Sequence, residues 1–505
     1  VVINPGFDAT PAGGPPSFPS PGAPSGTAEG CYGPDSASPP FRSEGTFPVL
    51  SKLETSGVAL SVDWRISETV NITSITGFRD MTMQSARDGD NTPANIFATV
   101  DDYDHQQFSQ ELQLHYRSDN QRFQSLLGLF YFDEEGFNLV DVIVPSGALR
   151  SGGFYDNQSF AAFSHASYEL SDATSVSLGL RFTQDIKGYL PDQYALGDAS
   201  MGGVPGFFDP TWPLLAGSYL APTGPLPAGT RILDFRRSEE RFDHTDYSFD
   251  LKQLLSENMT AYLSYSTAYK SGGFDQRFVG PTPDRAPSSY SPETVDSVEL
   301  GIKTRWLNGA LQLNAAIFDA RYDDLQVIVR ESFNPLTFNA GQASIRGGEL
   351  ELGWLIDENW SLDLGLGWLD TRYRQLTQSA QDSGVALSNS LVNAPPLNSS
   401  VGVTYLQDLG SYGSLQGRVD WIWKDEQFND AINSEQIRQA PYHQLNASLG
   451  FETPNSGWQL TLAARNLLNE TFLVGGNSAF DTAASYVERV YARPREIYLS
   501  ARLAF

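Results

Sequence analysis

The sequence holds a single cysteine, Cys31, among 505 residues. A disulfide within the chain is therefore excluded, as is a metal site built on paired cysteines. Such a chain suits either a reducing compartment or an envelope protein that does without disulfides. Basic residues are also scarce: the chain has 33 Lys and Arg but 60 Asp and Glu, which gives a net charge of −27. Nucleic-acid binding is not expected, since the phosphate backbone requires basic partners.

Long apolar runs are missing as well. A membrane helix needs about 18 to 20 consecutive apolar residues, and LLGLFYF at 126–132 is among the longest runs here. The first residues, VVINPGFDAT, carry no initiator methionine, basic region or apolar core of a signal peptide, so we expect a processed or truncated N-terminus. Residues 1–57 are rich in Pro, Gly and Ser and have no sustained period. This composition predicts a long loop or a disordered segment.

Motifs of catalysis and metal binding are not found. The five histidines are scattered, without an HExxH pair: His105, His115, His165, His244 and His443. GxSxG and GxxxxGK[ST] motifs are likewise missing. The acidic stretches DGD at 88–90 and YDD at 322–324 offer oxygen ligands for Ca²⁺, but acidic loops are usually just solvated. We expect neither an enzyme nor a bound cofactor or metal.

A repeated alternation of apolar and polar residues runs from Val58 to Phe505. Side chains of a strand alternate between its two faces, so each such stretch predicts a strand with one apolar and one polar face. One apolar row is Val298, Leu300, Ile302 and Trp306, opposite Glu299, Lys303 and Arg305. Another is Leu350, Leu352, Trp354 and Ile356, opposite Glu349 and Glu351. Further polar-side residues are Arg181, Arg418, Asp420 and Arg465. The interior of a small soluble barrel is apolar, so charged residues on the inner face indicate a wide, wet or plugged lumen.

The connections between these stretches alternate between short and long. The short turns are SET at 67–69, SDNQ at 118–121, SD at 171–172, SEN at 256–258, NG at 308–309, DEN at 357–359, GSYG at 410–413 and PNSG at 454–457. The long connections are 88–105, 135–153, 188–235, 271–292, 329–337, 372–398, 429–440 and 471–485. Short turns at one end and long loops at the other are typical of a transmembrane β-barrel. Aromatic residues at strand ends, among them Trp306, Trp360 and Trp368, fit its interfacial girdles.

Seventeen strands are expected after residue 57. They begin near 58, 70, 106, 122, 159, 174, 242, 259, 294, 310, 339, 360, 399, 414, 442, 458 and 486. A bacterial barrel closes with an even number of antiparallel strands. The odd number means either that one strand is miscounted or that strands are missing at the N-terminus, and the missing signal peptide favours the second interpretation.

These stretches resemble the TonB-dependent outer-membrane receptors, and specifically the C-terminal part of their barrel. The matching segments are ITSITGFRD (72–80), QFSQELQL (107–114), LLGLFYFDEE (126–135), SYSTAYKSGGF (264–274), SPETVDSVELGIKTRW (291–306), LNAAIFDARYDDLQV (313–327), NAGQASIRGGELEL (339–352), ARNLLNETF (464–472) and EIYLSARLAF (496–505). The resemblance implies an all-β, transmembrane antiparallel barrel with about 17 of 22 strands present in 58–505, and an extracellular location for 1–57. It also implies that Phe505 is the assembly signal read by the barrel assembly machinery.

The resemblance further implies energy-coupled uptake of a scarce large solute across the outer membrane of a Gram-negative bacterium. The solute is most often an iron–siderophore complex, with cobalamin, haem or an oligosaccharide as other members of the class. The TonB complex would act through a plug and a TonB box that this chain does not contain. A passive porin is the alternative, and a soluble all-β glycan-binding or structural protein is a third class.

The best candidate for contact with the solute is the connection 188–235, since loops of this length are usually functional or disordered. Its prolines stiffen a segment rich in aromatics, which can stack on a chelate or a sugar ring. The candidate contact residues are Tyr189, Tyr194, Phe207, Phe208, Trp212, Tyr219 and Arg231. The other interpretation is a lid packed on itself. Arg231 is the only cation in this loop, and Arg236 and Arg237 lie just beyond its end, so the loop favours a neutral or weakly charged solute.

Overall fold

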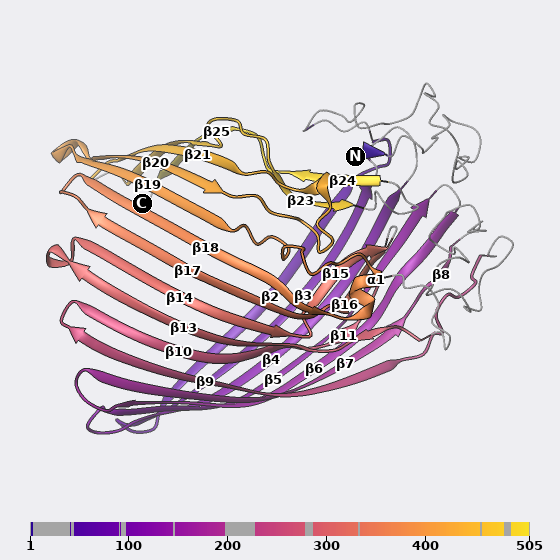
Figure 1. Ribbon diagram of the computed structural model, residues 1–505, viewed down its shortest axis with the longest axis horizontal. Helices are drawn as coiled ribbons and strands as arrows, with labels where there is room; N and C mark the ends of the chain where they lie inside the picture. Colours follow the sequence, from indigo (N-terminus) through magenta and orange to yellow (C-terminus); the bar gives the residue numbers. More distant parts are fainter. Residues whose placement is uncertain are drawn as a thin grey trace.

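The computed structural model describes residues 2–3, 41, 45–89, 91, 97–144, 147–196, 228–277, 286–331, 334–454, 457–478 and 486–503. In these ranges one antiparallel sheet curves into a barrel (Figure 1). Its wall has seventeen long strands: β2 (Leu50–Arg65), β3 (Val70–Asp88), β4 (Ala98–Arg117), β5 (Phe123–Val144), β6 (Gly147–Glu169), β7 (Thr174–Pro191), β9 (Ser238–Ser256), β10 (Met259–Lys270), β13 (Glu293–Trp306), β14 (Leu311–Asp323), β17 (Gly341–Leu355), β18 (Trp360–Leu376), β19 (Leu397–Asp408), β20 (Ser414–Lys424), β21 (Tyr442–Glu452), β22 (Trp458–Arg465) and β25 (Glu496–Leu503). The predicted fold class and number of strands are confirmed.

The eight predicted short turns all fall between consecutive wall strands and lie together at one end of the barrel, on the left in Figure 1. The Asn-Gly turn contains Asn308 and Gly309 with positive φ angles of 57° and 91°, the backbone conformation for which these residues are preferred. At the opposite end most connections are longer, and several carry their own small elements. We call these two ends the turn end and the loop end.

The small elements of the loop end are hairpins and single turns. They comprise β1 (Val2–Ile3), β8 (Tyr194–Ala195), β11 (Gly273–Phe274), β12 (Ser289–Tyr290), β15 (Gln326–Glu331), β16 (Asn334–Asn339), α1 (Gln378–Asp382), the 3₁₀ turn Glu435–Ile437, β23 (Leu473–Ser478) and β24 (Tyr486–Tyr491). Thr377 begins α1 as an N-cap, because its side chain accepts a hydrogen bond from the Ala380 amide. Among the described residues, no helix has the length and apolar character to cross a bilayer.

Several strands extend further than the alternation of the sequence predicted. β2 begins at Leu50 rather than 58, and β5 and β6 occupy most of the predicted connection 135–153. Residues 486–491 pair with β23 as β24, so the final wall strand, β25, begins only at Glu496. The physical reason is that both faces of a strand meet water beyond the bilayer. Hydrogen bonding between neighbours continues there, but the alternation that reveals a strand fades.

The two faces of the wall differ as the alternation predicted. On the outer face large apolar side chains are exposed, with Leu300 at 52% and Ile317 at 62% of their full area. On the inner face, Glu299 accepts a hydrogen bond of 2.6 Å from the Tyr262 hydroxyl. Arg418 pairs there with Asp363 at 3.0 Å. Apolar side chains exposed on the outside and ion pairs inside require lipid around the barrel and water or protein within it.

The two end strands of the wall, β2 and β25, are not joined by any hydrogen-bonded pairing in the described residues. β2 pairs with β3 and β25 with β22, and an antiparallel wall of seventeen strands makes both run in the same direction. At the loop end the seam is bridged by other contacts. Arg87 of β3 pairs with Glu488 of β24 at 2.7 Å, and β1 pairs with β24 through Val2 and Val487. Phe505 lies outside the described residues, and its role as an assembly signal stays a prediction.

We expect Leu300→Arg to destabilise the barrel by up to about 2–4 kcal/mol, because a guanidinium on the lipid face of the wall loses its hydration and this cost is largest at the bilayer midplane. Glu299→Arg, one residue away on the lumen side, is expected to cost much less. The measurement is the free energy of folding of each variant into lipid vesicles. Equal losses for the two variants would contradict the register assigned to β13.

Candidate substrate-binding site at the loop end

The described parts of the predicted recognition loop form a packed base at the loop end. The backbone of Ala195 bonds to both Thr230 and Gly229, at 3.0 and 2.8 Å, and β8 adds to the edge of β6. Ile232 and Leu233 are completely buried beneath this base. Residues 194–196 and 228–233 therefore form a packed platform that is joined to β6.

The candidate contact residues divide into two groups in this platform. Tyr189 is buried, with only 1% of its area exposed, and its ring stacks on Phe274 at 6.0 Å. Tyr189 thus supports the platform. Phe207, Phe208, Trp212 and Tyr219 lie outside the described residues.

Tyr194 lies close to two cations on this platform. The guanidinium carbons of Arg150 and Arg231 are 5.9 and 5.6 Å from the centre of its ring, within the range of cation–π attraction. Asp141 accepts two hydrogen bonds from Arg150 at 2.7 and 2.9 Å, and Asp192 pairs with Arg231 at 3.0 Å. Both cations are therefore neutralised locally, and the platform presents an aromatic surface of low net charge.

A cavity of about 670 Å³ lies elsewhere at the loop end. Four connections surround it: the β15–β16 hairpin, the segments 391–394 and 429–432, and β23. Its lining is mainly apolar, with Ile328, Leu391 and Val392 among the aliphatic residues. A volume of this size is typical of pockets for small-molecule ligands.

Two buried polar atoms of the cavity lining have no hydrogen-bond partner in the described residues. They are the hydroxyl of Tyr373 and the side-chain carbonyl of Asn429. An unsatisfied buried polar group costs about 1–3 kcal/mol, so such groups usually bond to water or to a ligand. One is a donor and the other an acceptor, so together they suit a ligand that carries both kinds of group.

The cavity is anchored to the barrel by a chain of polar contacts. Arg330 of β15 donates to Asn477 of β23 at 2.8 Å, Asn477 donates to Glu488 at 2.7 Å, and Glu488 pairs with Arg87 of β3. The lining also includes Glu293 and Asp430. With one cation and two carboxylates, the lining does not favour a strongly anionic ligand.

The residues of this cavity were not predicted as a site from the sequence. Tyr373, Arg330 and Asn429 each lie in a different stretch predicted as a long connection. The sequence signal was the length of the connections, which did identify the loop end. The convergence of three distant segments on one cavity depends on the order and curvature of the wall strands.

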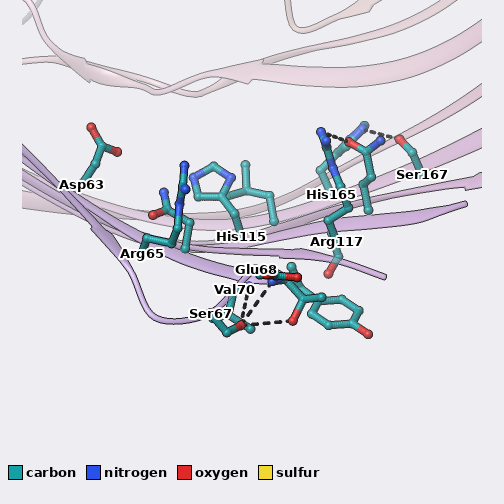
Figure 2. A pocket seen from close by; sticks show the side chains of 15 residues that line it. Asp63, Arg65, Ser67, Glu68, Val70, His115, Arg117, His165 and Ser167 are labelled. Atoms are coloured by element: carbon teal, nitrogen blue, oxygen red, sulfur yellow. Dashed lines mark hydrogen bonds between the residues drawn. The ribbon is translucent and has the colours of Figure 1, made fainter. Parts of the chain in front are cut away.

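The lumen at the turn end is a separate, strongly polar surface. A hollow of about 1080 Å³ lies along the inner face of β2 to β6 at the turn end. Figure 2 shows Asp63, Arg65, His115 and His165 among its lining residues. His115 bonds to Gln113 at 2.9 Å. In the described ranges no three His, Cys, Asp or Glu residues are placed to hold a metal ion. These two histidines behave as ordinary lumenal polar residues.

The family can now be assigned. A family model described as "TonB dependent receptor-like, beta-barrel" matches residues 4–467. The chain therefore belongs to the TonB-dependent receptors, outer-membrane proteins whose barrels it shares. This assignment confirms the resemblance found in the sequence.

Three relatives show how far the likeness extends. The pesticin receptor of Yersinia enterocolitica is 24% identical over 304 residues, which cover 60% of this chain and 38% of that receptor. The probable TonB-dependent siderophore receptor PiuA of Acinetobacter baumannii is 25% identical over 203 residues, covering 39% and 26%. The crystal structure of the ferric yersiniabactin uptake receptor FyuA from Yersinia pestis superposes with a TM-score of 0.73 at 18% identity, over 91% of this chain and 62% of that one. The chain thus spans less than two thirds of these relatives.

Asp275, beside β11, provides a pH-sensitive contact at the loop end. Burial raises its pKa to about 6 from an ordinary value of 3.8, against the opposing effects of the Thr337 amide, which donates to it at 2.8 Å, and of Arg277. The folded loop holds this proton more tightly than the unfolded chain does. The resulting stabilisation is complete below about pH 3.8 and is lost as the pH rises through about 6.

We therefore expect the hairpin β15–β16 and residues 271–277 to be better protected from hydrogen exchange at pH 5 than at pH 8, after correction for intrinsic exchange rates. Asp275→Asn should remove this difference and stabilise the segment at pH 8 by up to about 3 kcal/mol, the equivalent of the pKa shift. An unchanged pH dependence in the Asn variant would show that another group is responsible.

Proposed function

We propose that this chain is the barrel of a TonB-dependent outer-membrane receptor that takes up a scarce large solute, most consistently an iron–siderophore complex. The observation that supports the proposal best is the cavity at the loop end, where four connections meet above a polar lumen. A binding cavity outside and a polar path inside are what capture followed by passage requires. Two of the relatives, FyuA and PiuA, are described as a ferric yersiniabactin uptake receptor and a siderophore receptor.

The charges of the loop end favour a neutral or weakly charged chelate. On the platform, Arg150 and Arg231 are paired with carboxylates, and Arg237 contacts both Asp156 and Glu239. A strongly anionic ligand would have to displace these pairs at the cost of unpaired carboxylates. A phenolic or heterocyclic chelate could instead use the aromatic platform and the donor and acceptor of Tyr373 and Asn429.

The partners follow from this function. Energy would come from the TonB complex through a plug and TonB box outside residues 1–505, and the chain carries out no catalysis of its own. Cobalamin, haem and oligosaccharides are other solutes of the same class. A passive porin is the alternative function, but an apolar cavity with two unpartnered polar groups favours specific binding over free diffusion.

The experiment measures uptake of radiolabelled iron by cells that carry the full-length gene, supplied with a panel of siderophores of different charge, with and without a protonophore. Replacing residues 197–227 by a short Gly-Ser turn keeps the platform, because the pairing of Ala195 with Gly229 and Thr230 lies outside the deletion. We expect energised uptake to fall sharply while the barrel still assembles.

A matched pair of substitutions tests the cavity. Val392 lines it and is 39% exposed, whereas Leu387 on the same connection is 57% exposed and does not line it. Val392→Trp should weaken ligand binding at least about tenfold, or about 1.4 kcal/mol, and Leu387→Trp should leave binding unchanged. Uptake that survives the protonophore, the deletion and Val392→Trp would indicate a passive channel instead.

A further inference from the structure

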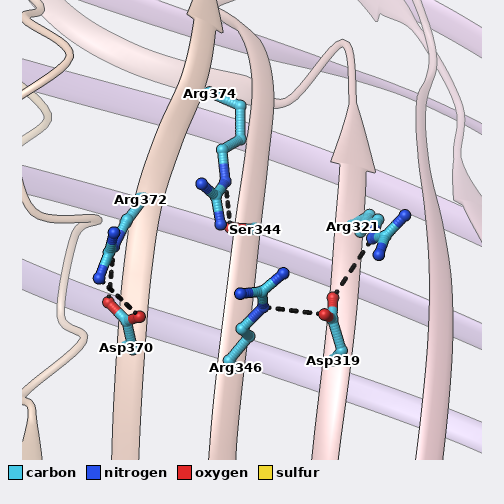
Figure 3. Close-up of polar contacts among 7 residues, drawn as sticks. All are labelled: Asp319, Arg321, Ser344, Arg346, Asp370, Arg372 and Arg374. Carbon is cyan, nitrogen blue, oxygen red and sulfur yellow. Dashed lines mark hydrogen bonds and ion pairs between the residues drawn. The ribbon is translucent and has the colours of Figure 1, made fainter.

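Four arginines gather on the wall strands β14, β17 and β18 near the loop end. They are Arg321, Arg346, Arg372 and Arg374, and Figure 3 shows them with Asp319, Asp370 and Ser344. We call these seven residues the basic patch. The chain as a whole has 60 acidic and 33 basic residues, so a group with four arginines and two aspartates reverses its overall balance.

The register of the strands places the basic patch on the outer face of the barrel. Residues paired across adjacent strands share a face, and Leu300, Ile317, Gly348 and Trp368 form one such row, across β13, β14, β17 and β18. Ile317 and Trp368 in this row are 62% and 52% exposed on the lipid side. The next row toward the loop end, on the same lipid-facing side, is Asp319, Arg346 and Asp370. The row after that is Arg321, Ser344 and Arg372.

The position of the patch along β18 corresponds to the lipid headgroups. Trp360 at the turn end and Trp368 enclose the outward leucines Leu362, Leu364 and Leu366. The stretch from Trp360 to Trp368 spans about 26 Å along the strand. Because strands of a barrel are tilted, this length corresponds to a height of about 20 Å across the bilayer, close to the height of the apolar band of a bacterial barrel. Trp368 therefore marks the outer interface, and Arg372 extends roughly 10 Å beyond it.

The arginines of the patch are only partly neutralised. Asp319 accepts from both Arg346 at 2.8 Å and Arg321 at 3.4 Å, and Asp370 accepts two bonds from Arg372. Arg374 donates to the Ser344 hydroxyl at 2.7 Å. Arg321 and Arg372 are 71% and 60% exposed, so their guanidinium groups can reach a ligand outside the wall.

Two more carboxylates flank the patch on its outer face, and each has a neutral partner. Asp296 accepts from the Tyr265 hydroxyl at 2.7 Å, and Asp323 accepts from Gln342 at 2.7 Å. On β5, β6, β7 and β9, the row of lipid-side residues that contains Asp133 and Gln158 continues to Ile186 and Arg241. This row holds one cation, whereas the basic patch holds four.

We propose that the basic patch binds the phosphorylated headgroup of a lipid in the outer leaflet. A guanidinium donates two parallel hydrogen bonds to a phosphate, a geometry that an ammonium group does not offer. Basic surfaces at the level of the headgroups bind anionic lipids in other membrane proteins. Arg321, Arg372 and Arg374 would grip the phosphate, with Asp319 and Asp370 holding the arginines in place.

The test uses the full-length receptor purified in detergent. Its thermal unfolding is followed while three probes are added: a bisphosphorylated glycolipid of the lipid A type, phosphatidylcholine, and inorganic phosphate. We expect the glycolipid alone to raise the Tm. The triple variant Arg321→Gln/Arg372→Gln/Arg374→Gln should need at least tenfold more glycolipid for the same shift, because binding to the folded state alone stabilises it.

The control is Arg241→Gln, which removes an exposed, outward cation on β9, far from the patch, and should leave the response to glycolipid unchanged. If the triple variant fails to fold, Arg374→Gln alone tests the same surface. An equal glycolipid response in wild type and variant would overturn the proposal. So would an equal shift with phosphatidylcholine, or a full shift with inorganic phosphate alone, which would indicate a site for the free ion.

Discussion

The bilayer leaves a backbone N–H or C=O group no water to bond to, and the rest of this structure depends on that constraint. The backbone groups of each wall strand form hydrogen bonds with the neighbouring strands. The side chains therefore alternate between the lipid and the lumen. Leu300 faces lipid while Glu299, one residue along, bonds to Tyr262 inside. The end strands β2 and β25 each have only one neighbouring strand in the described residues. At the loop end, contacts such as the Arg87–Glu488 ion pair connect the two sides of this gap.

The sequence predicts well wherever the bilayer imposes that alternation. All eight turns and the seventeen strands followed from it, because each turn interrupts a period of two. Prediction failed beyond the bilayer. The pairing of β24 with β23 delayed the last wall strand by ten residues, from 486 to 496, because strands in water on both faces carry no period to detect.

The candidate site shows the same limit. The length of the connections pointed to the loop end, and Tyr194 and Arg231 do lie together there. Tyr189 instead supports the platform from below, which a sequence cannot reveal, since an aromatic residue in a loop is equally suited to packing and to binding. The cavity around Tyr373 and Asn429 arises from contacts between segments more than fifty residues apart, and the basic patch appears only once the register of β14, β17 and β18 is known. Together they provide the observations on which the proposed capture of a solute at the loop end depends.

The most direct measurement is the accessibility of spin labels placed one at a time along β13, from residue 298 to 305, in the protein reconstituted in lipid. Cys31 is the only cysteine to replace first. Labels at even positions should be reached by oxygen dissolved in the bilayer, and labels at odd positions by a water-soluble nickel complex, with a period of two. Uniform accessibility, or a period near 3.6, would contradict a transmembrane wall with one face in lipid and the other in the lumen.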